Sequence, residues 1–213
     1  MKSKILIAAM AIALCILGAQ LFMEKHNSSN KDSNTISADS IVYENIMTRA
    51  SVRSYSDKTV EEEKIEKLLR AGMAAPSAVD KRPWHFVVVQ DKDMLKQIAE
   101  KTPNAGMAAE APLGIIVCGD SEYFLEGEAR DFWVQDLSAA TENILLVAHS
   151  MGLGAVWTGL WPSQERSALI RELIEAPEEI IPFCTIVIGY PKGDTTPKDK
   201  YDELNVSYEL YGE

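Results

Sequence analysis

The chain has 213 residues, of which 46% are hydrophobic and 25% charged, which suits one globular domain with a sizeable core. Its 32 Asp and Glu residues outnumber its 21 Lys and Arg residues, so the net charge is -11 at pH 7. Such an acidic surface repels nucleic acids and anionic lipids, which argues against a nucleic-acid-binding role. A local cluster of basic residues is therefore informative in this chain.

Residues 1–24 predict a membrane anchor or a signal segment. Lys2 and Lys4 precede an uncharged stretch, Ile5–Met23, which as a helix would span roughly the hydrocarbon core of a bilayer. Cleaved signal peptides have a shorter apolar region and small residues before the cleavage site, whereas the best site here places Leu17 where a small residue is needed. An uncleaved anchor is favoured over a cleaved signal, and both alternatives stay open.

Both alternatives place the rest of the chain on the outer, periplasmic side of an inner membrane, because the basic residues precede the apolar stretch. Residues 25–40 contain too few apolar side chains to fold and predict a polar tether. The folded domain is expected at residues 41–213.

Hydrophobic periodicity predicts alternating helices and strands from residue 39 onward. The expected helices are residues 39–48, 60–75, 92–101, 124 or 131 to 150, and 164–174, and the expected strands are 85–90, 113–120, 155–161 and 183–190. Strands and helices mixed in this way predict a layered α+β domain. The long helix ending at residue 150 is apolar on more than one face, which favours a second subunit covering part of it.

The cysteines and histidines indicate no metal centre. Cys118 and Cys184 lie in apolar, β-branched runs and are expected to be small core residues. No C-x-x-C pair is present, and the three histidines are isolated in sequence, so neither zinc nor a His-based triad is predicted. His149 lies near the end of the long helix, where a positive charge would interact favourably with the helix C-terminus.

Four short patterns are candidates for binding. Arg49-x-Ser51-x-Arg53 offers two guanidinium groups, which bind phosphate or carboxylate oxygens bidentately. The other three are a proline-bracketed loop, a glycine-rich turn into a strand and a basic stretch after the last strand, with the sequences APSAVDKRPW (75–84), GLGAVWTG (152–159) and GYPKGDTTPKDKY (189–201). Taken singly, each pattern is also typical of an ordinary turn, loop or helix end.

In this order and spacing, the four patterns resemble the nitroreductase family of flavin mononucleotide (FMN) enzymes. The matching residues are Arg49, Ser51 and Arg53, Ala75–Ala78 with Pro83–Trp84, Asn143–Gly159, and Ile188–Lys200. The resemblance extends from about residue 40 to the end of the chain. It implies a three-layer α/β/α sandwich with a central mixed sheet, assembled as a homodimer.

The resemblance also implies roles for individual residues. Arg49, Ser51, Lys198 and Lys200 would hold the phosphate end of FMN. Arg53 would lie near N1 and O2 of the ring, and Thr158 and Gly159 would present a backbone N–H to N5 or O4. Pro76, Ser77 and Ala78 would reach over the ring from the other subunit. Asp80 and Arg82 stand where the family usually has Asn and Gln, which leaves their effect on cofactor potential and substrate choice open.

The implied reaction is ping-pong hydride transfer from NADH, NADPH or another donor to nitroaromatic, quinone or flavin acceptors. The chemistry resides in the cofactor, so no catalytic residue and no metal are assigned. One alternative is a membrane-tethered flavin protein that relays or sequesters electrons without turnover; another is a domain that has lost its flavin. The segment between Gly119 and Asp131 is expected to control access to N5 of the ring. An enzyme needs an open ring face over N5, whereas the electron relay has a covered ring.

Overall fold

The computed structural model describes residue 20 and residues 38–212. The predicted membrane segment and most of the predicted tether lie outside these residues. Within the described part of the chain, no helix has both the length and the apolar composition needed to cross a membrane. The chain divides into two units at residues 44 and 45, and the second unit contains the sheet and the helices that pack on it.

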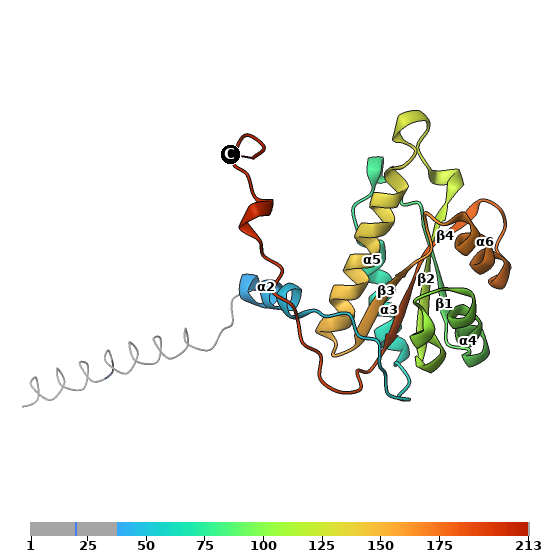
Figure 1. Ribbon diagram of the computed structural model, residues 1–213, viewed down its shortest axis with the longest axis horizontal. Helices are drawn as coiled ribbons and strands as arrows, with labels where there is room; N and C mark the ends of the chain where they lie inside the picture. Colours follow the sequence, from blue (N-terminus) through green and yellow to red (C-terminus); the bar gives the residue numbers. More distant parts are fainter. Residues whose placement is uncertain (1–19, 21–37, 213) are drawn as a thin grey trace, which may run out of the picture. The chain divides into compact units, whose positions relative to one another are not determined.

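Four strands form the central sheet in the order β1-β2-β4-β3 (Figure 1). They are β1 (Trp84–Val89), β2 (Leu113–Asp120), β3 (Gly154–Gly159) and β4 (Ile180–Gly189), and each neighbouring pair is antiparallel. Among the described residues, the parallel component of the expected mixed sheet is confined to a single bridge, between Ser51 and Ala155 at the outer edge of β3.

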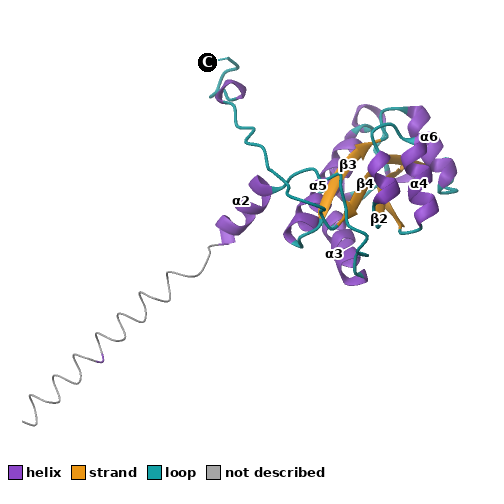
Figure 2. Ribbon diagram, turned by 60° about the horizontal axis from the view of Figure 1, so that its bottom comes forward, coloured by secondary structure: helices purple, strands orange, loops and turns teal. Residues whose placement is uncertain are grey.

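Helices cover both faces of the sheet and complete the predicted three layers (Figures 1 and 2). One face packs against α3 (Glu62–Met73) and α5 (Phe132–Ser150), the other against α4 (Lys92–Lys101) and α6 (Gln164–Leu173). A further helix, α2 (Ala38–Thr48), crosses the boundary between the two units. The predicted α+β sandwich is thus confirmed.

The residues of β2 show why the central strands are apolar throughout. Ile115 and Val117 belong to the core cluster under α3 and α5, whereas Ile116 and Cys118 belong to the cluster on the opposite face. Successive side chains of a strand point to opposite faces, so a strand covered on both sides must be apolar at every position. Cys118 and Cys184 are both fully buried and unbridged, which confirms their prediction as core residues.

Most element boundaries lie close to those expected. Helix α4 and strand β2 match the predicted ranges, while β3 ends two residues early and β4 begins three residues early. The long helix α5 begins at Phe132 and is preceded by two short 3-10 turns, Ser121–Tyr123 and Gly127–Ala129.

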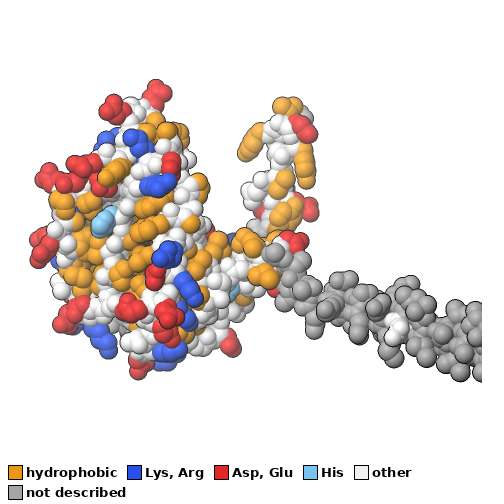
Figure 3. Space-filling view, turned by 180° about the vertical axis from the view of Figure 1, so that it is seen from behind, with side chains coloured by type: hydrophobic (Ala, Val, Ile, Leu, Met, Phe, Trp, Pro, Cys, Tyr) orange, Lys and Arg blue, Asp and Glu red, His pale blue; other side chains and the backbone are white. Residues whose placement is uncertain are grey.

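Large hydrophobic side chains remain exposed in several places. Figure 3 shows hydrophobic side chains gathered across the middle of one face of the folded body, with charged side chains around them. Six exposed large hydrophobic side chains come from the described residues after β4: Tyr201, Leu204, Val206, Tyr208, Leu210 and Tyr211. Exposed apolar clusters of this kind are typical of surfaces that associate with another protein or with another copy of the same chain.

The extended segment 51–56 packs against the open edge of β3. The Val52 N–H donates a 3.0 Å hydrogen bond to the Ala155 carbonyl. Val52 and Tyr55 are buried, and the Tyr55 hydroxyl lies 2.5 and 3.0 Å from the carbonyl oxygens of Val52 and Val187. The approach is possible because Gly154 has no side chain: a Cβ there would lie 2.6 Å from the Cβ of Val52.

We therefore expect Gly154→Ala to lower the free energy of unfolding by about 1–3 kcal/mol, the usual range for overpacking a core. Gly106→Ala is the matched control, because a Cβ at that position would meet no atom within 4 Å. Urea denaturation followed by circular dichroism measures both variants. Equal stability of the two would contradict the close contact between segment 51–56 and β3.

Candidate functional site

Alternate residues of the extended segment point to the same side of the chain, which explains the spacing of the R-x-S-x-R pattern. Val52 faces the core, whereas Ser51 and Arg53 are exposed. Arg49, Ser51 and Arg53 line one cavity of about 240 Å³. Lys198, Lys200 and Thr196, from the residues after β4, complete its lining together with Ala50.

This smaller cavity is suited to an anion. Four of its seven lining residues are cationic and none is acidic, although the chain as a whole is acidic. Arg49 forms an ion pair outside the lining, with its Nε 3.3 Å from Oε1 of Glu142 on α5. Within the described residues, Arg53, Lys198 and Lys200 form no ion pair. Converging cations and hydroxyls of this kind are the usual donors to phosphate.

A second cavity, of about 660 Å³, adjoins the first along the edge of β3. Arg53 lines both cavities, so the two cavities meet at this side chain. Thr158 and Gly159, at the end of β3, line the larger cavity. Trp157 and Trp161 add aromatic surface. Together the two cavities bring seven of the eleven predicted site residues into one continuous region.

The strand edge distinguishes Thr158 from Gly159. The Ala155 carbonyl accepts a hydrogen bond from Val52, so Ala155 points its backbone groups away from β4. Because these groups alternate along a strand, the N–H of Gly159 also lies on the open edge, whereas the N–H of Thr158 faces β4. The Thr158 hydroxyl already donates to the Thr185 carbonyl at 2.8 Å. Gly159 is therefore the better placed of the two as a backbone donor to a ligand.

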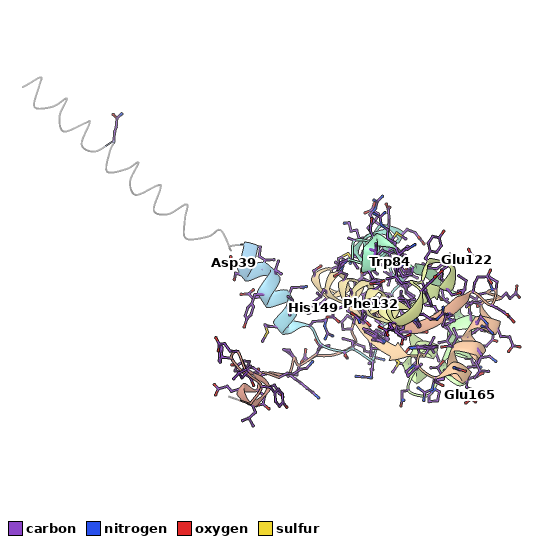
Figure 4. The ribbon with its side chains drawn as sticks, turned by 90° about the horizontal axis from the view of Figure 1, so that it is seen from above. Asp39, Trp84, Glu122, Phe132, His149 and Glu165 are labelled. Atoms are coloured by element: carbon purple, nitrogen blue, oxygen red, sulfur yellow. The ribbon has the colours of Figure 1, made fainter. Side chains whose placement is uncertain are left out.

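The other four predicted residues, Pro76, Ser77, Ala78 and Asp80, line neither of these cavities. Their loop lies instead against α5, where the Ala78 N–H donates to Oδ1 of Asp136 at 2.9 Å. Asp136 is only 7% exposed, and burial raises the pKa of its carboxyl while the Ala78 hydrogen bond opposes that shift. Figure 4 labels Phe132 and His149, the residues that mark the two ends of α5.

The loop is held in an unusual backbone conformation. Val79, Asp80 and Arg82 have φ values of 53°, 55° and 50°, and Val79 is 81% exposed. A β-branched residue at positive φ is rare, and each such residue costs on the order of 1–3 kcal/mol unless neighbouring contacts impose it. The Ser77 hydroxyl accepts a 2.9 Å hydrogen bond from the Arg82 N–H, which closes the loop on itself.

Asp80 and Arg82 form a bidentate pair. Nε and Nη2 of Arg82 donate to the two carboxylate oxygens of Asp80 at 2.7 and 2.6 Å. The guanidinium group lowers the pKa of the Asp80 carboxyl, which therefore stays ionised. The two departures from the family pattern thus compensate each other, because Arg82 balances the charge that Asp80 introduces.

The segment between Gly119 and Asp131 is anchored by aromatic packing. The ring of Phe124 stacks on Trp133 with centroids 4.8 Å apart and an interplanar angle of 9°. Trp133 in turn contacts Trp161, which lines the larger cavity, edge-on at 5.1 Å. No residue of this segment lines either cavity.

His149 corrects one expectation from the sequence. Its Nε2 lies 2.9 Å from the Thr48 hydroxyl, and both burial and the nearby positive charge of Arg49 lower its pKa. A histidine with a lowered pKa is neutral at pH 7, so the interpretation as positive charge at the helix end is wrong.

Four further residues of the larger cavity were not predicted from the sequence as site residues: Asn104, Met107, Trp161 and Arg166. Asn104 and Met107 lie in the turn after α4, and Arg166 lies in the first turn of α6. Asn104 has a φ of 68°, and the Pro103-Asn104 pair, which is typical of a turn, is the one signal that could have drawn attention to it. Nothing in the sequence around Arg166 marks it as a cavity residue.

The family model described as "Nitroreductase family" matches residues 46–105 and 98–190. The chain belongs to the nitroreductase family. This identifies it as an enzyme of the oxidoreductase type.

Individual relatives agree with the family assignment. A Methanothermobacter thermautotrophicus protein provisionally named NADH dehydrogenase/NAD(P)H nitroreductase is 50% identical over 80% of this chain and 87% of its own length. A Bacteroides thetaiotaomicron crystal structure with the same provisional name has a TM-score of 0.76 and 48% identity, covering 80% of this chain and 98% of that one. An FMN-dependent nitroreductase from Clostridium difficile has a TM-score of 0.73 and 30% identity over 79% and 99%.

Proposed function

We propose that the protein is an FMN-dependent oxidoreductase that accepts electrons from NADH or NADPH. The observation that carries this proposal is the pair of adjoining cavities that share Arg53. FMN joins a phosphate to a flat aromatic ring through a ribityl chain. The smaller cavity, with four cations, fits the phosphate, and the larger cavity, with two tryptophans and a strand edge, fits the ring. Relatives named as NAD(P)H nitroreductase and as FMN-dependent nitroreductase support the same cofactor and donor.

Each residue then has a definite task. Arg49, Lys198 and Lys200 would bind the phosphate oxygens, and Ser51 would add a hydroxyl donor. Arg53 would lie beside the pyrimidine side of the ring, where its positive charge favours the reduced, anionic state. The Gly159 N–H would direct a hydrogen bond from the edge of β3. FMN supplies the hydride chemistry, and the protein holds the ring and limits what can stack on it.

A donor and an acceptor would use the same exposed ring face in turn, which is a ping-pong reaction. Nitroaromatics, quinones and free flavins are the proposed acceptors. The alternative of an electron relay without turnover is distinguished by reoxidation of the reduced flavin. If nitroaromatics and quinones reoxidise dithionite-reduced protein no faster than buffer does, the relay is favoured over the enzyme.

The smaller cavity is tested by FMN binding. We expect residues 39–213 to bind one FMN per subunit, and Arg49→Ala to weaken that binding by about 1.5–3 kcal/mol, the scale of a lost hydrogen bond to a charged group. Arg70→Ala is a matched control, because Arg70 pairs with Glu66 on the exposed side of α3 and lines neither cavity. Flavin fluorescence titration measures both variants. Unchanged affinity in Arg49→Ala would remove its role at the phosphate.

We also propose that the functional unit is a homodimer in which the Pro76–Ala78 loop of one subunit covers the ring bound by the other. Two observations support this: the loop lines neither cavity of its own subunit, and large apolar side chains after β4 are exposed. The apolar surface of α5 is a further part of the proposed interface.

If the ring lies between subunits, FMN binding and dimerisation must be thermodynamically linked. We expect saturating FMN to lower the dimer dissociation constant, as measured by sedimentation equilibrium with and without the cofactor. Stoichiometric FMN binding by a protein that stays monomeric at every concentration would contradict the shared site.

For the N-terminus, we propose an uncleaved anchor formed by Ile5–Met23, with the flavin domain on the outer side of an inner membrane. The support is the apolar stretch behind Lys2 and Lys4 in the sequence. Protease added to intact spheroplasts should release an active, yellow domain by cutting between residues 25 and 40. Protection until the membrane is broken would reverse the orientation and make a cytoplasmic nicotinamide donor the simpler account.

A further inference from the structure

Arg166 is held in place at the start of α6. The Ser163 side chain accepts a hydrogen bond from the Arg166 N–H at 3.4 Å and so caps the helix. The next residue, Ser167, is buried and donates from its hydroxyl to the Pro182 carbonyl of β4 at 2.7 Å. One turn further on, Ile170 is fully buried in the core. The backbone that carries Arg166 is therefore fixed to the sheet, and its partly buried side chain lines the larger cavity.

The charged side chains of the larger cavity are all positive. Its charged lining residues are Arg53 and Arg166, and no carboxylate lines it. Asn104 can donate hydrogen bonds from its side-chain amide. The Thr158 hydroxyl already donates its hydrogen bond to the Thr185 carbonyl of β4. Within the described residues, the Arg166 guanidinium forms no hydrogen bond and no ion pair. A partly desolvated, unpaired guanidinium favours the entry of an anion.

The proposed function assigns no ligand to Arg166. There, Arg53 and Gly159 serve the flavin ring from the side of β3, next to the phosphate cavity. Arg166 comes from a different element, α6, in the same cavity as the turn that carries Asn104 and Met107. The two arginines of this aromatic-lined cavity could therefore meet two different negative groups. Arg53 would face the negative charge of the reduced flavin ring, and Arg166 would face a charged group on the molecule that reacts with the ring.

We infer that Arg166 is a specificity residue that selects electron donors or acceptors carrying an oxyanion, a carboxylate or a phosphate, beside their flat reactive ring. The inference rests on the proposed function, because it assigns the larger cavity to the flavin ring and its reaction partner. The oxyanion has two sources, an acid group on the acceptor or the phosphates of a nicotinamide dinucleotide. Both would be bound by the same bidentate guanidinium contact.

The test compares holoenzymes of the wild type, Arg166→Gln and Arg171→Gln. Arg171 is a matched control because it lies on the same helix, carries the same charge and lines neither cavity. Each protein is assayed with two pairs of substrates that differ in the oxyanion. The acceptor pair is 4-nitrobenzoate and 4-nitrobenzamide, and the donor pair is NADH and 1-benzyl-1,4-dihydronicotinamide.

We expect Arg166→Gln to lower the ratio of kcat/KM for the charged over the neutral member by about tenfold or more in at least one pair, since a hydrogen bond to a charged group is of that size. The pair that responds identifies the source of the oxyanion. Arg171→Gln should leave both ratios within about twofold of the wild type. In the absence of turnover, benzoate should perturb the flavin absorbance of the oxidised wild type at lower concentrations than benzamide does, and Arg166→Gln should remove that difference.

Ratios unchanged in both pairs would overturn the inference. An equal loss of kcat/KM for charged and neutral members would also overturn it, since Arg166 would then serve the ring or the fold. The proposed function is judged separately, by whether the wild type transfers electrons from the neutral donor to the neutral acceptor at all.

Discussion

The contact between segment 51–56 and the open edge of β3 is the constraint on which the candidate site depends. Gly154 lets the backbone of Val52 approach β3, and the Ala155 carbonyl fixes its register. Once that register is set, the alternation of an extended chain decides which side chains reach the core and which reach the cavity. The buried Tyr55 side chain stabilises the inward side, because its hydroxyl lies close to the carbonyl oxygens of Val52 and Val187. The outward side then presents Ser51 to the smaller cavity and Arg53 to both cavities.

Charge explains why this arrangement is suited to an anion rather than to a neutral group. An acidic chain would neutralise scattered basic residues by pairing them, as Arg70 pairs with Glu66 and Lys58 with Glu61. In the smaller cavity, by contrast, the segment before β3 and the residues after β4 bring four cations together, and only Arg49 has an acidic partner. A phosphate in this cavity would relieve the mutual repulsion of the four cations, and that relief would add to its binding free energy.

The sequence predicted the layers and most elements because they follow from local pattern. The apolar run at β2 and the periodicity of α4 leave few alternatives to a buried strand and an amphipathic helix. The R-x-S-x-R pattern singled out three residues that line one cavity. Local pattern could not predict that Arg166 lines the larger cavity, because this depends on how α6 packs beside the residues that follow α4. It also could not find the pairing of Asp80 with Arg82, which needs two residues at positive φ that no rule assigns to Asp-Lys-Arg. The failure with His149 has a similar cause: helix position favours the charged form, but burial and Arg49 outweigh it.

The Ser77–Arg82 loop combines backbone strain with high exposure. Three non-glycine residues at positive φ oppose folding, and the loop contributes little burial in return, since Val79 is almost fully exposed. The conformation persists because Asp136, the Ser77 hydroxyl and the Asp80–Arg82 pair together over-determine it. Asp136 is itself a buried carboxylate, so the loop is maintained by a group whose own burial is unfavourable. A loop that is already rigid is suited to contact a ligand or a partner, because it loses little further conformational entropy on binding. That is the property the proposed dimer requires of it.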